Sequence, residues 1–97
     1  MKISATRSGG YAGLAENYYV DTALLADPQR SAIEGQVEKV RFFNAPPEVP
    51  PGSVGADLDR WEITITDRHR QRTVSFYQDG SPDTADWQAL TDLIRRP

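Results

Sequence analysis

Apolar and polar residues alternate in four short stretches of the chain, and a two-residue period of this kind predicts strands. In residues 60–66, Trp61, Ile63 and Ile65 alternate with polar residues, as expected of a strand with one buried face. The same alternation predicts the other three strands over residues 2–6, 14–21 and 72–77.

Two further segments repeat their apolar residues at helical spacing instead. The first is predicted to open at Asp27 and Pro28, because these residues suit the N-cap and the first turn of a helix. The second covers residues 84–95 and ends with arginines, which are favourable at the C-terminal end of a helix. The predicted buried stripes are Ile33, Val37 and Val40 in the first helix, and Trp87, Leu90, Leu93 and Ile94 in the second.

The order of these elements is strand, strand, helix, and then the same again. It predicts an α+β fold in a single domain over residues 1–97, an antiparallel sheet of about four strands with two helices on one face (ββαββα). Residues 44–57 connect the halves and contain four prolines and two glycines, which exclude a central strand and a helix interior. We refer to this segment as the crossing and expect it to run over the surface.

The composition of the chain argues against several classes of function. With 97 residues, a net charge of -3 and a pI of about 5.0, the chain lacks the basic character typical of nucleic-acid binding. It contains no cysteine, so disulfides and thiolate chemistry are excluded. The sequence shows no apolar signal region and no run approaching the ~20 apolar residues of a membrane span. We therefore expect a cytoplasmic protein that binds neither nucleic acid nor membrane.

The residues that catalysis would require are missing as a set. The single histidine, His69, lies among arginines in a predicted hairpin turn and is interpreted as a solvated turn residue. Asp57 and Asp59 are too few oxygen ligands for a calcium loop. The glycine-rich segment 8–13 precedes a predicted strand, whereas a phosphate loop needs a helix there. We expect no enzyme activity, no metal and no cofactor.

The connection between the first two predicted strands is the most unusual feature. Residues 7–13 read Arg-Ser-Gly-Gly-Tyr-Ala-Gly, so three glycines surround one aromatic residue. Glycine permits positive φ and the close approach of another surface. Two interpretations of Tyr11 remain open, a ring that enters a pocket on a partner and a ring that folds back over the sheet edge. Leu14 is likewise either an anchor or the first core residue of the next strand.

This string resembles the start of the emfourins, small bacterial protein inhibitors of thermolysin-like metallopeptidases such as protealysin. The similarity continues through Phe42-Phe43, the proline-rich crossing, the Trp61-Glu62-Ile63-Thr64-Ile65 strand and the C-terminal helix, so it covers essentially the whole chain. The resemblance implies a non-catalytic inhibitor without a cofactor, which is a monomer when free and occludes the active-site cleft of its target with surface loops.

A thermolysin-like enzyme has a catalytic zinc and an apolar pocket in its cleft, and the resemblance implies that the loop carrying Tyr11 and Leu14 fills that cleft. A stable inhibitor interface buries roughly 1,600 Å² in total, which one short loop cannot supply, so we expect the crossing to make a second contact. The expected peptidase-binding residues are Arg7, Ser8, Gly9, Gly10, Tyr11, Ala12, Gly13 and Leu14 in the loop, and Pro47, Glu48 and Val49 in the crossing.

An alternative function is a non-catalytic adaptor that pairs an exposed strand edge with a partner protein or peptide. The charged turn at residues 68–72 and the crossing would then frame the binding site. A small enzyme is the weakest hypothesis, because the chain shows no catalytic triad, metal set or cofactor loop.

Overall fold

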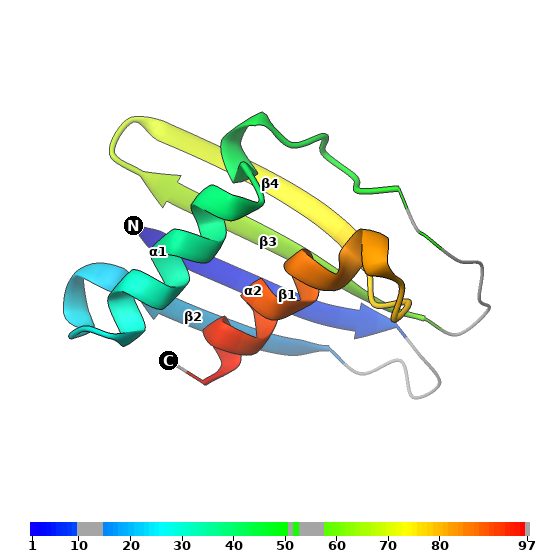
Figure 1. Cartoon of the computed structure of the whole chain (residues 1–97), viewed down its shortest axis with the longest axis horizontal. Helices are drawn as coiled ribbons and strands as arrows, with labels where there is room; N and C mark the ends of the chain where they lie inside the picture. Colours follow the sequence, from blue (N-terminus) through cyan, green and yellow to red (C-terminus); the bar gives the residue numbers. More distant parts are fainter. Residues whose placement is uncertain (10–14, 51, 53–57, 97) are drawn as a thin grey trace.

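In the computed structural model, residues 1–9, 15–50, 52 and 58–96 are described. They form one four-stranded antiparallel sheet with two α-helices on one face (Figure 1), which confirms the predicted ββαββα fold class. The strands are β1 (Lys2–Gly9), β2 (Glu16–Asp21), β3 (Asp59–Asp67) and β4 (Arg70–Tyr77). The helices are α1 (Gln29–Lys39) and α2 (Ala85–Arg95), with short 3₁₀ turns at η1 (Thr22–Leu24), η2 (Phe42–Asn44) and η3 (Pro82–Thr84).

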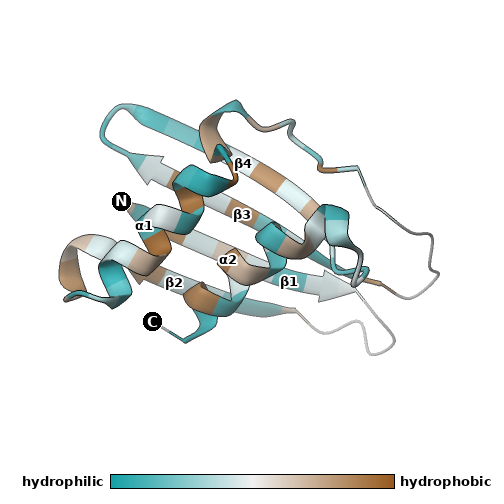
Figure 2. Ribbon diagram, in the orientation of Figure 1, coloured by the Kyte–Doolittle hydropathy of each residue, from teal (hydrophilic) through white to brown (hydrophobic). Residues whose placement is uncertain are grey.

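The sheet has the order β2-β1-β3-β4, so the first strand of each half lies in its centre. Ile3 pairs with Val20 on one side and with Ile65 on the other, which places apolar side chains from three strands on the same face. Both helices turn their apolar residues toward this face (Figure 2). The buried core consists of Ile3, Ala5, Val20, Ile33, Val37, Phe42, Ala45, Val49, Trp61, Ile63, Ile65, Val74, Phe76, Trp87, Leu90 and Ile94.

Three of the strands are longer than the alternation predicts, because cross-strand pairing continues beyond the apolar residues. β1 extends to Gly9, which pairs with Asp59 at the start of β3. At the other end of β3 the hairpin closes through a two-residue turn, and Arg68 there adopts a φ of 59°. His69 is exposed on this turn, as expected.

Most residues of the predicted helical stripes are buried, but Val40 lies just beyond α1 and is partly buried, as is Leu93 in α2. Ile33 and Val37 are buried in α1. The helix begins at Gln29 with Pro28, not the predicted Asp27, at the N-cap, and Asp27 Oδ1 accepts the backbone N–H of Ser31 in the first turn at 3.2 Å. In α2, Thr91 joins the predicted apolar residues in the core, with its hydroxyl donating to the carbonyl of Gln88 at 2.8 Å. Phe42 follows α1 and lies 5.8 Å from Trp87 between ring centroids, which fastens the two helices together.

Candidate functional site

The base of the predicted binding loop, residues 7–14, lies beside the C-terminal base of the crossing at one end of the sheet. β1 ends at Gly9 with a φ of +90°, and β3 begins directly beside it at Asp59. A Cβ on Gly9 would lie 3.4 Å from the carbonyl oxygen of Leu58, so the two backbones approach closely here. The first segment therefore departs from the sheet next to the point where the crossing returns. The predicted contacts Gly10, Tyr11, Ala12, Gly13 and Leu14 lie outside the described residues.

An ion pair joins these two bases. Arg7 Nε lies 3.0 Å from Asp59 Oδ2, and both side chains are about a quarter exposed, at 28% and 25%. A partly exposed pair of this kind contributes at most about 1 kcal/mol, so it fixes geometry more than it adds stability. Asp59, which the sequence did not favour as a metal ligand, pairs with the guanidinium of Arg7. Ser8, the next predicted contact, pairs with Arg60 inside the sheet.

The first residues of β2 are held by a second polar group. The hydroxyl of Tyr18 donates to Glu16 Oε2, and this bond, together with the charges of Arg7 and Arg95, lowers the pKa of the Glu16 carboxyl. The Tyr18 ring lies 5.9 Å from Trp61 between centroids, and the Arg95 guanidinium lies 5.8 Å from the Tyr18 ring. The described strand on each side of residues 10–14 is therefore fixed by contacts to β3 or α2.

The crossing is pinned at Gly52 by the carboxylate of Asp79. Asp79 Oδ2 accepts the backbone N–H of Gly52 at 2.7 Å, while Oδ1 accepts the N–H of Ser81 at 2.9 Å and its hydroxyl at 2.7 Å. Thr84 adds its hydroxyl at 2.7 Å. Donation from Ser81 above all, and from Thr84 and Gly52, holds the pKa of Asp79 far below its ordinary value.

The same contact explains why residue 52 is glycine. A Cβ at Gly52 would lie 2.3 Å from Ser81 Oγ and 2.7 Å from Asp83 Oδ2. The backbone can therefore approach Asp79 only if no side chain intervenes. Proline and glycine content indicated a surface connection, but the Asp79 contact spans 27 positions and left no local signal in the sequence.

The first part of the crossing adds a short backbone pairing to β4. The N–H of Ser75 donates to the Pro47 carbonyl at 2.8 Å, and the N–H of Val49 donates to the Ser75 carbonyl at 2.8 Å, which gives a parallel bridge at Glu48. This arrangement agrees with the exclusion of a central strand, since the segment lies outside β4 (Figure 1). Arg72 donates to the carbonyl of Ala45 and holds the start of the segment.

The predicted contacts in the crossing differ in their exposure to solvent. Pro47 and Glu48 are exposed, whereas the side chain of Val49 is 7% exposed and belongs to the core. Val49 is therefore turned toward the protein's own interior. The sequence pattern did not show this because Val49 stands between prolines, away from any periodic run.

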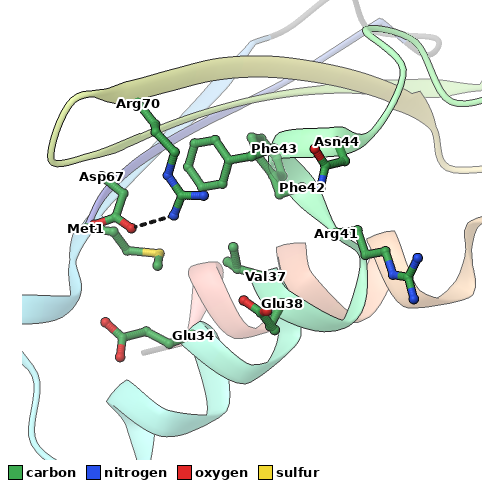
Figure 3. Close-up of a pocket in the computed structure, with 10 residues that line it drawn as sticks. All are labelled: Met1, Glu34, Val37, Glu38, Arg41, Phe42, Phe43, Asn44, Asp67 and Arg70. Carbon is green, nitrogen blue, oxygen red and sulfur yellow. Dashed lines mark hydrogen bonds and ion pairs between the residues drawn. The ribbon is translucent and has the colours of Figure 1, made fainter.

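A recess of about 320 Å³ lies at the opposite end of the sheet and was not predicted (Figure 3). Glu34 and Glu38 from α1 project into it, and the guanidinium of Arg70 lies 4.1 Å from the centre of the Phe43 ring. Arg70 also pairs with Asp67 at 3.1 Å. Charges of both signs line the recess, which also includes Met1, Val37, Arg41, Phe42 and Asn44.

Two absences can be stated for the described part of the chain. Within residues 1–9, 15–50, 52 and 58–96, no three His, Cys, Asp or Glu side chains are grouped so that they could hold a metal ion. No helix among the described residues is long and apolar enough to cross a membrane.

The family model described as Emfourin matches residues 5–96, nearly the whole chain. No curated protein and no solved structure matches the chain. The matched region contains both strand ends at the candidate site, the crossing and both helices.

Proposed function

The chain belongs to the Emfourin family, and from that membership we propose that it is a reversible inhibitor of thermolysin-like zinc metallopeptidases. The family is one of protease inhibitors, so an inhibitory role and binding to a metallopeptidase, without the identity of that enzyme, follow from membership itself. The target class and the mechanism are the proposal. In that mechanism, residues 7–14 obstruct the active-site cleft and the exposed residues Pro47 and Glu48 belong to the second contact.

The observation that best supports this mechanism is the bracing of the sheet end that presents the segment. Gly9 lies against the start of β3, Arg7 is paired with Asp59, and Gly52 is pinned by Asp79. Tight inhibitors bind with little rearrangement, because a surface that is already ordered loses less entropy on association. The contacts therefore hold the described parts of both segments in place, at Gly9 before residues 10–14 and at Gly52 in the crossing.

The buried position of Val49 refines the proposed contact set. The sequence suggested three neighbouring contacts, Pro47, Glu48 and Val49, but the Val49 side chain lies in the core. We propose that Pro47 and Glu48 contact the enzyme and that Val49 fixes the backbone on which they stand. Arg7 is proposed to position the loop through Asp59, in addition to any contact of its own.

An inhibition assay tests the proposal directly. Residual thermolysin activity on a peptide substrate is measured against increasing inhibitor, for the wild-type chain and for a variant combining Tyr11→Ala with Gly10→Arg. Removing a central aromatic anchor costs about 2 kcal/mol or more, so we expect inhibition to weaken at least about tenfold.

Tyr19→Ala is the matched control, since Tyr19 is a 62% exposed tyrosine on β2. It should inhibit as the wild type does. If the double variant is folded, as judged by its thermal unfolding, and inhibits equally well, then the interface lies elsewhere. If the wild-type chain does not inhibit at all, the assignment of the target class fails.

A further inference from the structure

The strand β2 forms an open edge of the sheet. The opposite edge, β4, carries the backbone pairing of the crossing at Ser75, but among the described residues β2 pairs only with β1. In Figure 1, β2 lies along the outer margin of the sheet on the side away from β4. An unpaired strand edge presents free backbone donors and acceptors that can pair with another chain.

The register shows which backbone groups face outward. The N–H of Thr22 donates to the Met1 carbonyl at 2.9 Å, so this pair is a hydrogen-bonded one. Hydrogen-bonded and non-hydrogen-bonded pairs alternate along an antiparallel ladder. Glu16, Tyr18 and Val20 therefore bond toward β1, while three alternate residues of β2 direct their N–H and C=O groups away from the sheet. These residues are Asn17, Tyr19 and Asp21.

The side chains of this edge do little to prevent association. Tyr19 is 62% exposed, and Leu24, just beyond the strand, is 83% exposed; these are the large hydrophobic residues found exposed in the described ranges. β2 contains neither proline nor lysine, which natural proteins commonly use to protect an edge.

We propose that β2 pairs antiparallel with β2 of a second copy of this chain, about a two-fold axis at Tyr19. In that register Tyr19 faces Tyr19 of the other copy, and Asn17 of each copy faces Asp21 of the other. All of the outward backbone groups on the three residues then find partners, and the two sheets join into one.

The side chains of Asn17 and Asp21 supply the hydrogen-bond donor and the acceptor that this register requires. The Thr6 hydroxyl donates to Asn17 Oδ1 at 2.9 Å, which leaves the amide N–H groups of Asn17 to point elsewhere. Asp21 Oδ1 accepts the N–H of Ala23 at 3.0 Å, which leaves Oδ2 as an acceptor. Each amide therefore meets a carboxylate across the interface, and opposite partners of this kind stabilise strand pairing.

The pairing leaves the proposed inhibitory surface free. Because the two strands run in opposite directions, the ends of the two sheets that carry Gly9 point away from each other. A contact between two six-residue strands is small, so the dimer is of the weak, concentration-dependent class. This differs from the monomer expected from the sequence, and it does not depend on which enzyme the protein inhibits.

Sedimentation velocity over a concentration series, up to about 1 mM, tests the pairing with a charge swap. Asn17→Asp places carboxylates opposite one another at two symmetric positions and should raise the dissociation constant of the dimer roughly tenfold. Adding Asp21→Asn exchanges the partners and should restore the wild-type constant. Both changes keep the acceptor for Thr6 and the acceptor for Ala23, so each variant should retain the fold.

A crosslinking experiment gives a second, independent measurement, because the chain has no cysteine of its own. The residues of a hydrogen-bonded antiparallel pair lie about 5.5 Å apart at Cα, within the span of a disulfide. Tyr19→Cys should therefore form a disulfide dimer under mild oxidation. Ser4→Cys, exposed on the neighbouring strand β1 opposite Tyr19, should form it at least about tenfold more slowly, since β2 lies between it and the edge.

Wild-type protein that remains monomeric across the series would overturn the proposal. Equal dissociation constants for Asn17→Asp and the charge-swapped variant, or equal crosslinking of the two cysteine variants, would overturn this register. If β2 instead pairs with a strand of a bound peptidase, the wild type stays monomeric alone and Asn17→Asp changes only inhibition.

Discussion

At the scale of single residues, two carboxylates organise the candidate site. Asp59 receives Arg7 at the base of the first segment, and Asp79 receives the backbone of Gly52 in the second. Each joins parts of the chain that are distant in sequence, so neither role could be predicted from local pattern. Asp59 pairs with the guanidinium of Arg7, and Asp79 accepts N–H and hydroxyl groups.

The Asp79 contacts predict a pH-dependent stability. Hydrogen bonding lowers the pKa of Asp79 below its ordinary value of 3.8, so its stabilising contribution is present above that value and is lost as pH falls toward the folded-state pKa. The wild type should therefore lose thermal stability on acidification below about pH 4 more steeply than Asp79→Asn. Circular dichroism melting at stepped pH measures the difference.

Asp83→Asn is the control for that experiment, because Asp83 is an exposed carboxylate on the same turn. It should follow the wild-type pH dependence. Parallel curves for the wild type and Asp79→Asn would show that the network around Asp79 does not stabilise the fold.

Arg7 offers a test of positioning against direct contact. Arg7→Gln should lower the free energy of unfolding by less than about 1 kcal/mol, because the pair with Asp59 is partly exposed. Inhibition should weaken about fivefold, equivalent to about 1 kcal/mol, if the pair holds the loop. Asp59→Asn should then have the same effect, and the two changes together should not add. Inhibition unchanged by Asp59→Asn would instead mean that Arg7 acts directly on the enzyme.

At the scale of elements, the two helices differ in how firmly their sequences specify them. α2 has a continuous buried stripe, whereas α1 contains Gly35 in its interior and buries only Ile33 and Val37. A Cβ at Gly35 would meet no atom within 4 Å. α1 is therefore held more by its tertiary contacts through Phe42 than by its own propensity.

Two glycines should respond oppositely to the same substitution. Gly35→Ala should raise the free energy of unfolding by about 0.5–1 kcal/mol, since alanine favours the helix and meets open space. Gly52→Ala should lower it by about 1–3 kcal/mol, since the new methyl group overlaps Ser81. Urea denaturation of both variants measures this. Similar effects of the two changes would contradict the described environment of Gly52.

The elements themselves could be predicted because each has a local signature. Alternation identified β3 through Trp61, Ile63 and Ile65, and helical spacing identified α2, so the order and fold class followed. The extension of β1 to Gly9 and the backbone pairing at Val49 were missed, because both arise from partners distant in the sequence. The candidate loop was found from its glycines and its resemblance to the emfourins, whereas the contacts that brace it were not predicted.

At the scale of the whole molecule, one apolar layer between the sheet and the helices stabilises the fold. Trp61 and Phe76 are fully buried in the sheet. On the helical side, the Trp87 ring lies 6.2 Å from Phe76 and 5.8 Å from Phe42 between centroids. Trp61 also donates its indole N–H to Gln78 at 3.0 Å, so its polar atom is satisfied near the site. The core and the braced end of the sheet are thus continuous.

Phe42→Ala should show how much this layer depends on a single ring. Truncating a buried phenylalanine costs about 3–5 kcal/mol, a large share of the roughly 5–15 kcal/mol that stabilises a typical domain. In chemical denaturation, the variant should reach its unfolding midpoint at a low denaturant concentration. Leu24→Ala, at an 83% exposed position, should change the unfolding free energy by less than about 0.5 kcal/mol. Comparable losses in the two variants would contradict the assignment of the core.

The tether at Gly52 also bears on how such a protein survives an enzyme that digests proteins. A peptidase cuts a stretch of chain only after that stretch is released from its neighbours. Gly52 is held by the turn before α2 and Gly9 by the adjoining strand, so neither can be drawn out without opening structure shared with the core. Resistance to digestion would then be a property of the entire fold, and a peptidase obstructed by this chain would cleave it only slowly.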